Sequence, residues 1–451
     1  MRYFFTLLFC LFTFFKSFAQ TQIPAILSMR DRAKIMDDLL EDKINSVLPM
    51  LMNRAEIDMW VIVAREYNED PVVKTMLPAT WLAARRRTIL VLYNEAGTEN
   101  IEALAVARYD VGSVFKKAWN KEEEPDQWKA LVKIIEERNP RKIGINMSEH
   151  FALADGITAT EHDALMNSLP QQYRNSIVSA EKLAIGWLET RTPREMAIYE
   201  QISRIAHAII AEGFSEKVIQ PGVTTTDDVV WWFRERIREL KLQTWFHPTV
   251  DIQRADKNSE LYAFSGRPGF NIIQPGDLLH CDFGITYLKL NTDTQELAYV
   301  LKPGEKEAPK YLKEALKAGN RAQDILTEQF ETGKTGNKIL ADALAQAKSE
   351  NNRATIYTHP IGYHGHAAGP TIGMWDNQGD TPFRGDYPLY PNTAYSIELN
   401  TKVFIKEWDK DIRVMLEEDA FYDGEKVMYI DGRQEDLLLI PRQASHLGNL
   451  W

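Results

Sequence analysis

Residues 278–300, with the sequence LLHCDFGITYLKLNTDTQELAYV, decide how the second half of this chain is interpreted. Asp282 and Asp293 lie eleven positions apart, with apolar runs outside them and β-prone residues between them. This pattern predicts two antiparallel strands joined by a turn near residues 287–289. A hairpin centred there would place the two carboxylates directly opposite each other, which is destabilising unless a proton or a cation lies between them. The stretch alone favours the simpler interpretation that one aspartate belongs to a surface turn, because Asp is common and the interval lacks an Asn-Gly turn signal.

The composition is that of an ordinary globular protein. The 451 residues are 44% hydrophobic and 26% charged, which is enough chain for two domains with sizeable cores. The formal net charge is -11. An acidic balance of this size argues against nucleic acid as a partner and against a basic membrane-binding patch.

Residues 1–19 differ from the rest of the chain. A charged start precedes an apolar, Phe-rich run over residues 3–15, and a small residue follows at Ala19. This pattern predicts a signal peptide that is cleaved before Gln20 and an exported protein, periplasmic or secreted, with no stable membrane anchor afterwards. Lys16 lies close to the predicted cut, which leaves an uncleaved anchor as the alternative.

Cleavage of the leader would leave Cys281 as the only cysteine. An exported protein with one cysteine has no internal disulfide, so core packing must stabilise it. Cys281 neighbours Asp282 in a strand and should point to the opposite face, which favours a buried structural thiol.

The order of the expected elements divides the chain into two parts. Helices and short strands interleave over residues 31–146, which predicts a layered α/β domain. A capping box at Thr192 then begins a long helix. Helices, the aspartate hairpin, two more helices and further strands follow, which is an α+β pattern compatible with a curved antiparallel sheet backed by helices.

Histidines are concentrated in the segment THPIGYHGHAAGP. His359, His364 and His366 fall within eight residues, whereas the whole chain has nine histidines. A structural role rarely needs such a concentration. The prolines and glycines around them predict a loop or a strand end.

Two strand-like segments add carboxylates. NTAYSIELN contains Glu398, and IRVMLEEDAFYDG contains Glu417, Glu418 and Asp419. Adjacent residues of a strand face opposite ways, so at most one of Glu417 and Glu418 can face a given site. Aspartates, glutamates and an imidazole form an oxygen-rich ligand set that suits manganese, cobalt, iron or zinc, and four carboxylates can neutralise two divalent ions. The combined pattern predicts metal-assisted hydrolysis.

At these residues the chain resembles the pita-bread metallopeptidases, which include methionine aminopeptidase, Xaa-Pro aminopeptidase, prolidase and the metal-free creatinase. That family orders its ligands as Asp, Asp, His, Glu and Glu, with the aspartates eleven positions apart in a hairpin. The segments DFG and HPIG match its Asp-x-Gly and His-x-x-Gly motifs, SIELN matches its first glutamate run, and its final Glu-Asp pair favours Glu418 over Glu417. The resemblance implies a metal-ligand set of Asp282, Asp293, His359, Glu398 and Glu418.

The resemblance also implies domains and roles. The first half resembles the creatinase-type amino-terminal domain, so a creatinase-like α/β domain is expected over residues 20–187 and an α+β pita-bread catalytic domain with a curved antiparallel sheet over residues 188–451. Two divalent ions are implied, manganese first, with cobalt, zinc or iron as alternatives. Asp293 and Glu418 would bridge them, Glu398 would also shuttle a proton, and His366 would stabilise the tetrahedral intermediate.

One family feature has no direct match. The family has a substrate-side histidine about seventeen residues before its first aspartate, where this chain has Ser265. The nearest upstream histidine is His247, thirty-five residues before Asp282. Either an insertion has displaced the alignment and His247 takes the catalytic role, or the role is lost.

The expected function is an exported Xaa-Pro aminopeptidase that acts on a peptide substrate, and the resemblance implies a homodimer. A prolidase-type dipeptidase is the nearest alternative. The missing histidine, and the residues that follow Asp293 and Glu398, leave open a non-catalytic peptide- or partner-binding module. A metal-dependent hydrolase or lyase of a small non-peptide substrate is also open.

Overall fold

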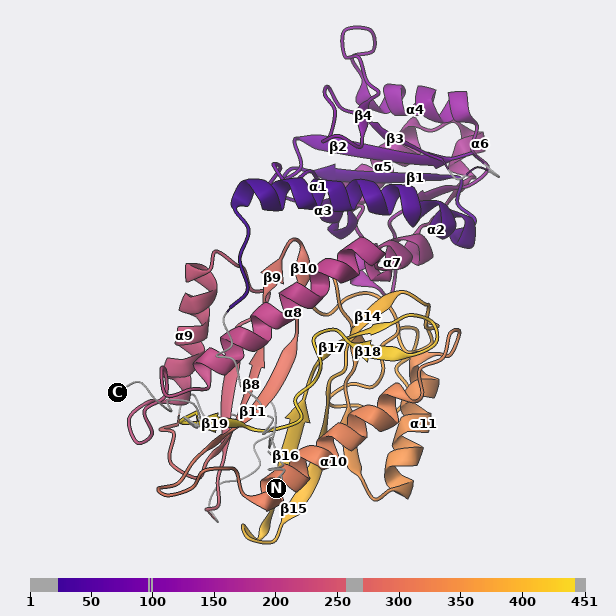
Figure 1. The fold of residues 1–451 in the computed structure, drawn as a ribbon. Helices are drawn as coiled ribbons and strands as arrows, with labels where there is room; N and C mark the ends of the chain where they lie inside the picture. Colours follow the sequence, from indigo (N-terminus) through magenta and orange to yellow (C-terminus); the bar gives the residue numbers. More distant parts are fainter. Residues whose placement is uncertain (1–22, 96–97, 99, 257–270, 443–451) are drawn as a thin grey trace, which may run out of the picture.

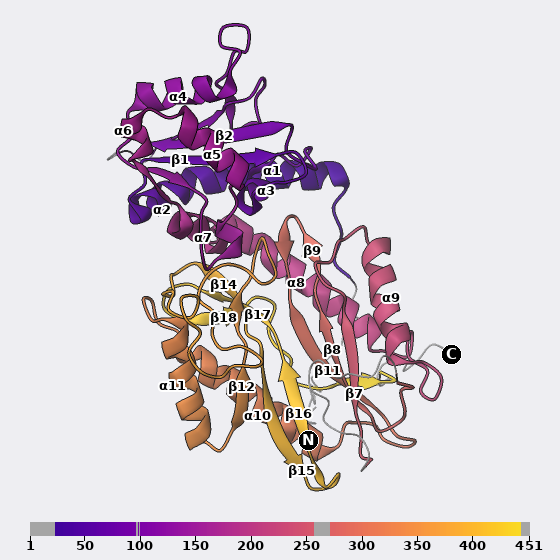
Figure 2. The same cartoon turned by 180° about the vertical axis from the view of Figure 1, so that it is seen from behind.

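The computed structural model describes residues 23–442 apart from 96–97, 99 and 257–270. Figures 1 and 2 show two parts, an upper part built on one sheet and a lower part in which several sheets curve between long helices. The α/β part followed by an α+β part confirms the expected fold class. Residues 1–19 and Ser265 lie outside the described residues.

The first part contains a six-stranded sheet with the order β4-β3-β2-β1-β5-β6. Side chains alternate across its central strand β1 (Met59–Arg65), so Trp60 and Ile62 enter one core, and Val61 and Val63 enter the core on the other face. The other strands are β2 (Arg87–Asn94), β3 (Ile101–Ala105), β4 (Lys116–Lys117), β5 (Ile143–Ile145) and β6 (Ile177–Ser179).

Helices cover both faces of this sheet (Figure 1). The first two helices are separated at Val47, and the second begins with Pro49 in its first turn. The helices are α1 (Met29–Ser46), α2 (Leu48–Ala55), α3 (Pro71–Met76), α4 (Gln127–Arg138), α5 (Ala159–Ser168), α6 (Gln171–Arg174) and α7 (Glu181–Glu189). The predicted domain boundary falls inside α7 and stays a prediction.

The second part begins with α8 (Pro193–Gly213), the long helix that runs diagonally across the sheets in Figure 1. Its capping box is formed: the Thr192 hydroxyl accepts from the Glu195 N–H, and the Glu195 carboxylate accepts from the Thr192 N–H. The remaining helices are α9 (Thr226–Glu239), α10 (Lys310–Thr327) and α11 (Gly336–Ser349).

Three small sheets and one hairpin line the inner side of these helices. Their orders are β19-β11-β8-β7, β12-β15-β16, β13-β14-β17-β18 and β10-β9. The Gln295 N–H donates to the Glu417 carbonyl, which joins the first sheet to the strands of the other two and gives one curved surface. The strands are β7 (Thr249–Gln253), β8 (Leu278–Phe283), β9 (Thr286–Tyr287), β10 (Leu290–Asn291), β11 (Thr294–Val300), β12 (Arg353–Ile356), β13 (His359–Pro360), β14 (Thr393–Ser396), β15 (Leu399–Ile405), β16 (Lys410–Leu416), β17 (Asp419–Tyr422), β18 (Val427–Tyr429) and β19 (Leu438–Ile440).

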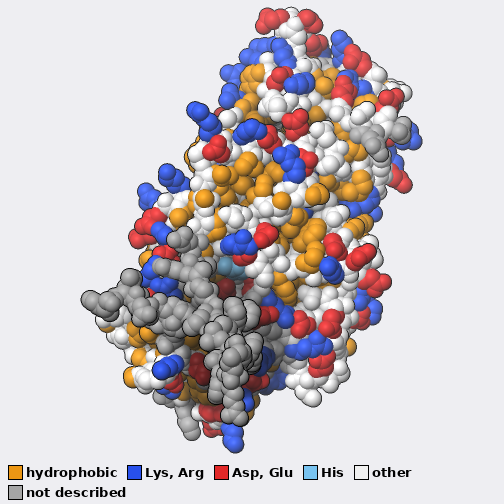
Figure 3. Space-filling view, in the orientation of Figure 1, with side chains coloured by type: hydrophobic (Ala, Val, Ile, Leu, Met, Phe, Trp, Pro, Cys, Tyr) orange, Lys and Arg blue, Asp and Glu red, His pale blue; other side chains and the backbone are white. Residues whose placement is uncertain are grey.

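A buried ionic cluster connects the two parts. Lys43 of α1 donates to the Thr190 carbonyl over 2.6 Å and lies 3.5 Å from the Glu195 carboxylate. Arg191 and the Tyr363 hydroxyl contact the same carboxylate at 3.3 and 2.8 Å. Because Tyr363 belongs to the histidine-rich loop, this cluster fixes that loop against the first part. Figure 3 shows apolar side chains gathered across the middle of the visible face, where the two parts meet.

The aspartate hairpin also contacts the first part. Its turn residues Leu288 and Lys289 have positive φ angles of 54° and 67°, as a two-residue hairpin turn requires. The Lys289 ammonium donates to the carbonyls of Thr75 and Leu77 over 3.2 and 2.7 Å. Burial lowers the pKa of Lys289 to about 8.

Lys289→Met should change how stability depends on pH. Between the folded pKa of about 8 and the unfolded value of about 10.4, the unfolded chain binds more protons at this lysine, so its contribution to stability rises with pH. The unfolding free energy of the wild type relative to Lys289→Met should therefore rise by about 2 kcal/mol from pH 8 to pH 10 in urea titrations. Lys310→Met, at an exposed lysine, should show no such rise. If the difference in unfolding free energy between the wild type and Lys289→Met did not change with pH, the lowered pKa of Lys289 would be refuted.

Candidate metal centre

The two aspartates lie on one face of the hairpin, but they are not directly opposite each other. Asp282 pairs with Gln295, and Tyr287 pairs with Leu290, so the hairpin is centred between Leu288 and Lys289. The prediction that the two aspartates lie directly opposite each other is therefore wrong, because the centre of the turn lies one residue later in the chain than expected. Asp293 instead lies diagonally across from Asp282, which still allows the two carboxylates to approach.

Two groups of ligand atoms meet at this place, and they share one residue. Asp282, Asp293 and Glu417 form the first group, and His359, Glu398 and Glu417 form the second. Within each group the ligand atoms lie within 4.8 Å of one another. The hairpin, β13, the β14–β15 junction and the β16–β17 junction each contribute, which explains why residues far apart in sequence meet here.

The structure corrects the choice between the two adjacent glutamates. Glu417 faces the cluster, and its carboxylate lies 3.7 Å from His359 Nε2. Glu418 faces the other side of the sheet, as strand alternation requires. There it contacts His207 Nε2 at 3.0 Å and accepts from the Gln434 N–H over 2.8 Å. The predicted ligand Glu418 is therefore wrong, and Glu417 occupies the place expected for it.

His207 has carboxylate partners on both ring nitrogens. Its Nδ1 lies 3.0 Å from Asp431, and its Nε2 lies 3.0 Å from Glu418. Although burial opposes the charge, Glu418 and Asp431 outweigh it and raise the pKa of His207 well above its usual value. His207, Glu296 and Glu418 lie close enough together to be considered as metal ligands. The ion pairs of a protonated His207 with Glu418 and Asp431 explain this cluster without a metal.

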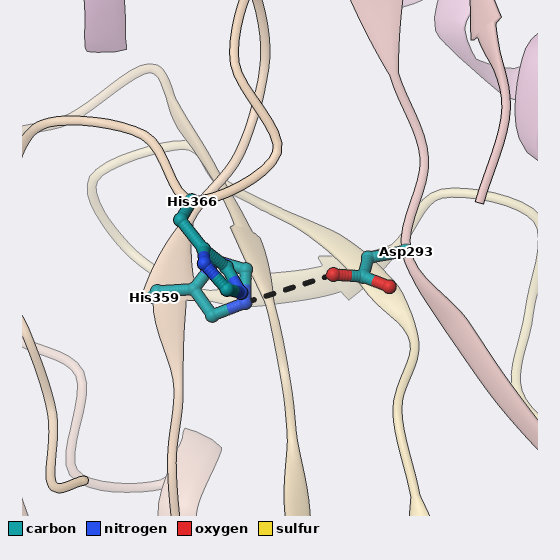
Figure 4. A group of neighbouring side chains, drawn as sticks. All are labelled: Asp293, His359 and His366. Atoms are coloured by element: carbon teal, nitrogen blue, oxygen red, sulfur yellow. Dashed lines mark ion pairs between the residues drawn. The ribbon is translucent and has the colours of Figure 1, made fainter. Parts of the chain in front are cut away.

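His359 and His366 lie side by side at the candidate centre (Figure 4). Their ring centroids are 4.6 Å apart, and the Asp293 carboxylate faces them, with 3.8 Å between His359 Nε2 and Asp293 Oδ2. His366 is exposed, and Trp245 and Tyr357 flank its ring. Desolvation and the nearby His359 lower the pKa of His366 to about 4, so this ring is neutral near pH 7.

The charges of the cluster fit a bound cation. Burial and the neighbouring carboxylates of Glu417 and Asp282 raise the pKa of Asp293 well above its usual value. Asp293 Oδ1 and His359 Nε2 are buried and have no hydrogen-bond partner among the described residues. Unsatisfied buried ligand atoms on both sides of a shared carboxylate are what divalent ions would satisfy, so the residues present fit a metal centre.

Comparison with known proteins places this site in a family. Residues 197–425, about half of the chain, match the model of metallopeptidase family M24. The chain belongs to this family. A search of curated proteins by sequence found no match.

Solved structures share the fold of this M24 protein along nearly their whole length. The X-Pro aminopeptidase from Thermotoga maritima MSB8 is 17% identical, with a TM-score of 0.59, and the match covers 86% of this chain and 99% of the other. The Xaa-Pro dipeptidase from Bacillus anthracis is 16% identical, with a TM-score of 0.55, covering 91% and 100%. A putative aminopeptidase P from Bacillus anthracis is 12% identical, with a TM-score of 0.57, covering 88% and 96%. The expected pita-bread fold is confirmed.

His247 does not join the cluster of this M24 protein. It is exposed, its Nδ1 lies 2.9 Å from an Arg234 guanidinium nitrogen, and its ring packs near Trp231. The structure thus gives His247 partners on α9 and none among the ligands of the candidate centre in the described residues. Trp245, two residues earlier, is the one whose ring contacts His366, at 5.2 Å between centroids.

The sequence interpretation missed two residues of the site. Trp245 lies in a segment with no motif, so its contact with His366 had no visible signal. Gln295 is one of the residues that follow Asp293, and the structure shows its amide between Glu398 and Glu417. Its position two residues after Asp293 was the available signal, because strand alternation places both side chains on the same face.

The predicted thiol is confirmed as buried. Cys281 is fully inaccessible and lies in the core behind the hairpin. Burial raises its pKa well above the usual value, which leaves it uncharged and unreactive.

Proposed function

We propose that this chain is an exported, metal-dependent peptidase that releases the amino-terminal residue from peptides with proline at the second position. The observation that carries the proposal is the pair of ligand groups that share Glu417, since two adjacent metal positions with a common carboxylate suit hydrolysis of an amide bond. The structural neighbours named X-Pro aminopeptidase and Xaa-Pro dipeptidase support the substrate class.

The proposed metal positions differ in their ligands. Asp282, Asp293 and Glu417 would hold one divalent ion, and His359, Glu398 and Glu417 would hold the other. Manganese is proposed first, with cobalt, zinc or iron as alternatives, because carboxylates dominate the ligand set. When bound, such ions supply a water of lowered pKa and polarise the scissile carbonyl.

The protein residues then bind the substrate and move protons. Glu398 lies at the edge of the cluster, where its carboxylate could take a proton from the attacking water and pass it to the leaving amine. His366, neutral and exposed beside His359, could donate an N–H to the developing oxyanion. Trp245 and Tyr357 flank that ring on the protein side.

Peptide assays test the proposed function directly. The manganese-loaded protein should release the first residue from Xaa-Pro tripeptides and longer peptides. Cleavage restricted to Xaa-Pro dipeptides would instead indicate a prolidase-type dipeptidase, which the structural neighbours equally suggest. Two tightly bound metals without cleavage of any peptide would indicate a binding module or an enzyme for small non-peptide substrates.

His366→Asn should separate chemistry from metal binding. If His366 acts on the oxyanion, kcat should fall by about 10²–10³-fold while both metals remain bound. Elemental analysis and steady-state kinetics measure the two effects in one preparation. His359→Asn, the matched variant at a proposed ligand, should lose metal as well as activity. Loss of metal from His366→Asn would contradict the separation of roles.

Export is proposed from the sequence of residues 1–19 alone. Mature protein isolated from its native source should begin at or near Gln20, and a cytoplasmic form that retains Met1 would refute export. Within the described ranges, none of the helices combines the length and apolar character that a membrane span requires. A homodimer is proposed only from the family resemblance, and sedimentation equilibrium would test it.

A further inference from the structure

Gln295 lies beneath the candidate metal centre and contacts two of its carboxylates. It belongs to β11 and is only 4% exposed. Its amide nitrogen Nε2 is 2.9 Å from Glu398 Oε1 and 2.7 Å from Glu417 Oε2. Its amide oxygen is 2.8 Å from His280 Nε2. The side chain therefore uses both amide hydrogens on glutamates that come from two different strand junctions.

The partners determine the orientation of this amide. Ionised carboxylates only accept hydrogen bonds, so the NH₂ group must face Glu398 and Glu417. The amide oxygen then faces His280, whose Nε2 must carry the hydrogen. His280 Nδ1 lies 3.5 Å from Asp251 Oδ2, directly across the strand pair. A row of side chains on β7, β8 and β11 thus supports the amide from behind.

The contacts of Gln295 select which oxygens face the metal positions. Glu398 Oε1 and Glu417 Oε2 are the atoms that bind the amide. Their other oxygens, Glu398 Oε2 and Glu417 Oε1, are the atoms that lie 4.0 and 3.7 Å from His359 Nε2. A side chain that fixes one oxygen of each glutamate also fixes the direction of the second oxygen.

The length and the two donors of the side chain are what bring the glutamates together here, since one amide donates to both carboxylates. A threonine or leucine at position 295 could not reach both carboxylates. Glutamine combines the length and the two donors that this geometry needs.

We propose that Gln295 is a positioning residue that presents Glu398 and Glu417 to the metal position completed by His359. The inference rests on the metal centre proposed above. It predicts an unequal effect, because both carboxylates that the amide binds, Glu398 and Glu417, are ligands of the His359 position, whereas only the shared Glu417 belongs to the other position. The ion held by Asp282 and Asp293 should depend on it less.

Manganese titration of the metal-free protein by calorimetry tests this proposal without any peptide. The wild type should bind two ions. Gln295→Met, which keeps the length and removes the donors, should bind one ion about as tightly as the wild type and the other about 10–100-fold more weakly. Gln295→Asn, which keeps the amide but is one methylene shorter, should show the same selective loss.

Gln434→Met is the matched control. Gln434 is also buried, and its amide pairs with the backbone of Leu297 on β11, away from the metal positions. This variant should bind both ions as the wild type does. Equal weakening of both ions, or no weakening, in folded Gln295→Met and Gln295→Asn would overturn the positioning role while leaving the peptidase proposal intact. A wild type that binds no manganese would instead overturn the proposed metal centre itself.

Discussion

Glu417→Gln should abolish peptidase activity, whereas Glu418→Gln should leave it intact. Glu417 is the residue common to both ligand groups, so an amide at this position removes a negative charge from both proposed metal positions. The loss of metal-based stabilisation is worth several kcal/mol, and we expect kcat/KM to fall by at least about a thousandfold. The prediction is tested by assaying how fast each variant releases the amino-terminal residue from an Xaa-Pro peptide and by measuring its metal content.

Glu418→Gln is a close control because it makes the same chemical change one residue away. Glu418 is equally buried, but it contacts His207 and the Gln434 N–H on the opposite face of the sheet. We expect this variant to keep its activity and metal, and to lose about 1–3 kcal/mol of stability through the weakened contact with His207. The account would be contradicted if Glu418→Gln lost activity while Glu417→Gln kept it.

Glu195→Gln should be the most destabilising single change in the contact between the two parts. The Glu195 carboxylate is fully buried and balances two buried cations, Lys43 and Arg191. Burial lowers the pKa of Lys43 well below its usual value even with Glu195 present, which shows how costly its charge is. Removing the carboxylate leaves buried positive charges uncompensated, and we expect a loss of about 3–5 kcal/mol in the free energy of unfolding.

Denaturant titration measures this loss, and Glu200→Gln provides the control. Glu200 is on the same helix, but its side chain is 54% exposed and pairs with Arg204, also exposed. That change should cost less than about 1 kcal/mol. An equally small effect for Glu195→Gln would show that the cluster does not stabilise the contact. Because Tyr363 donates to Glu195, Glu195→Gln should also weaken metal binding at the histidine-rich loop.

The fold could be predicted because its local signals agree with the structure. The capping box at Thr192, the periodic apolar positions of α8 and α9, and the apolar runs of β1 and β2 each correspond to one element. The hairpin was visible for the same reason. Its centre was not, since Leu288 and Lys289 adopt positive φ without the Asn-Gly sequence that usually announces such a turn.

The sequence was enough to predict which residue types would form the metal site, but not which residue supplies every ligand. Alternation showed that only one of Glu417 and Glu418 could face the site, but the phase of that alternation depends on pairing with β11, which is a long-range contact. The contact between Trp245 and His366, and the amide of Gln295 between two glutamates, also require the assembled sheets. Residues that support a site only through tertiary contacts cannot be recognised from their spacing along the sequence.

The most direct test of the account is a crystal of the manganese-loaded protein and its anomalous difference map. We predict two peaks, one beside Asp282 and Asp293 and one beside His359 and Glu398, with the Glu417 carboxylate between them. Peaks at His207 and Glu418 on the opposite face of the sheet, or no peak beside Glu417, would contradict the proposed metal centre.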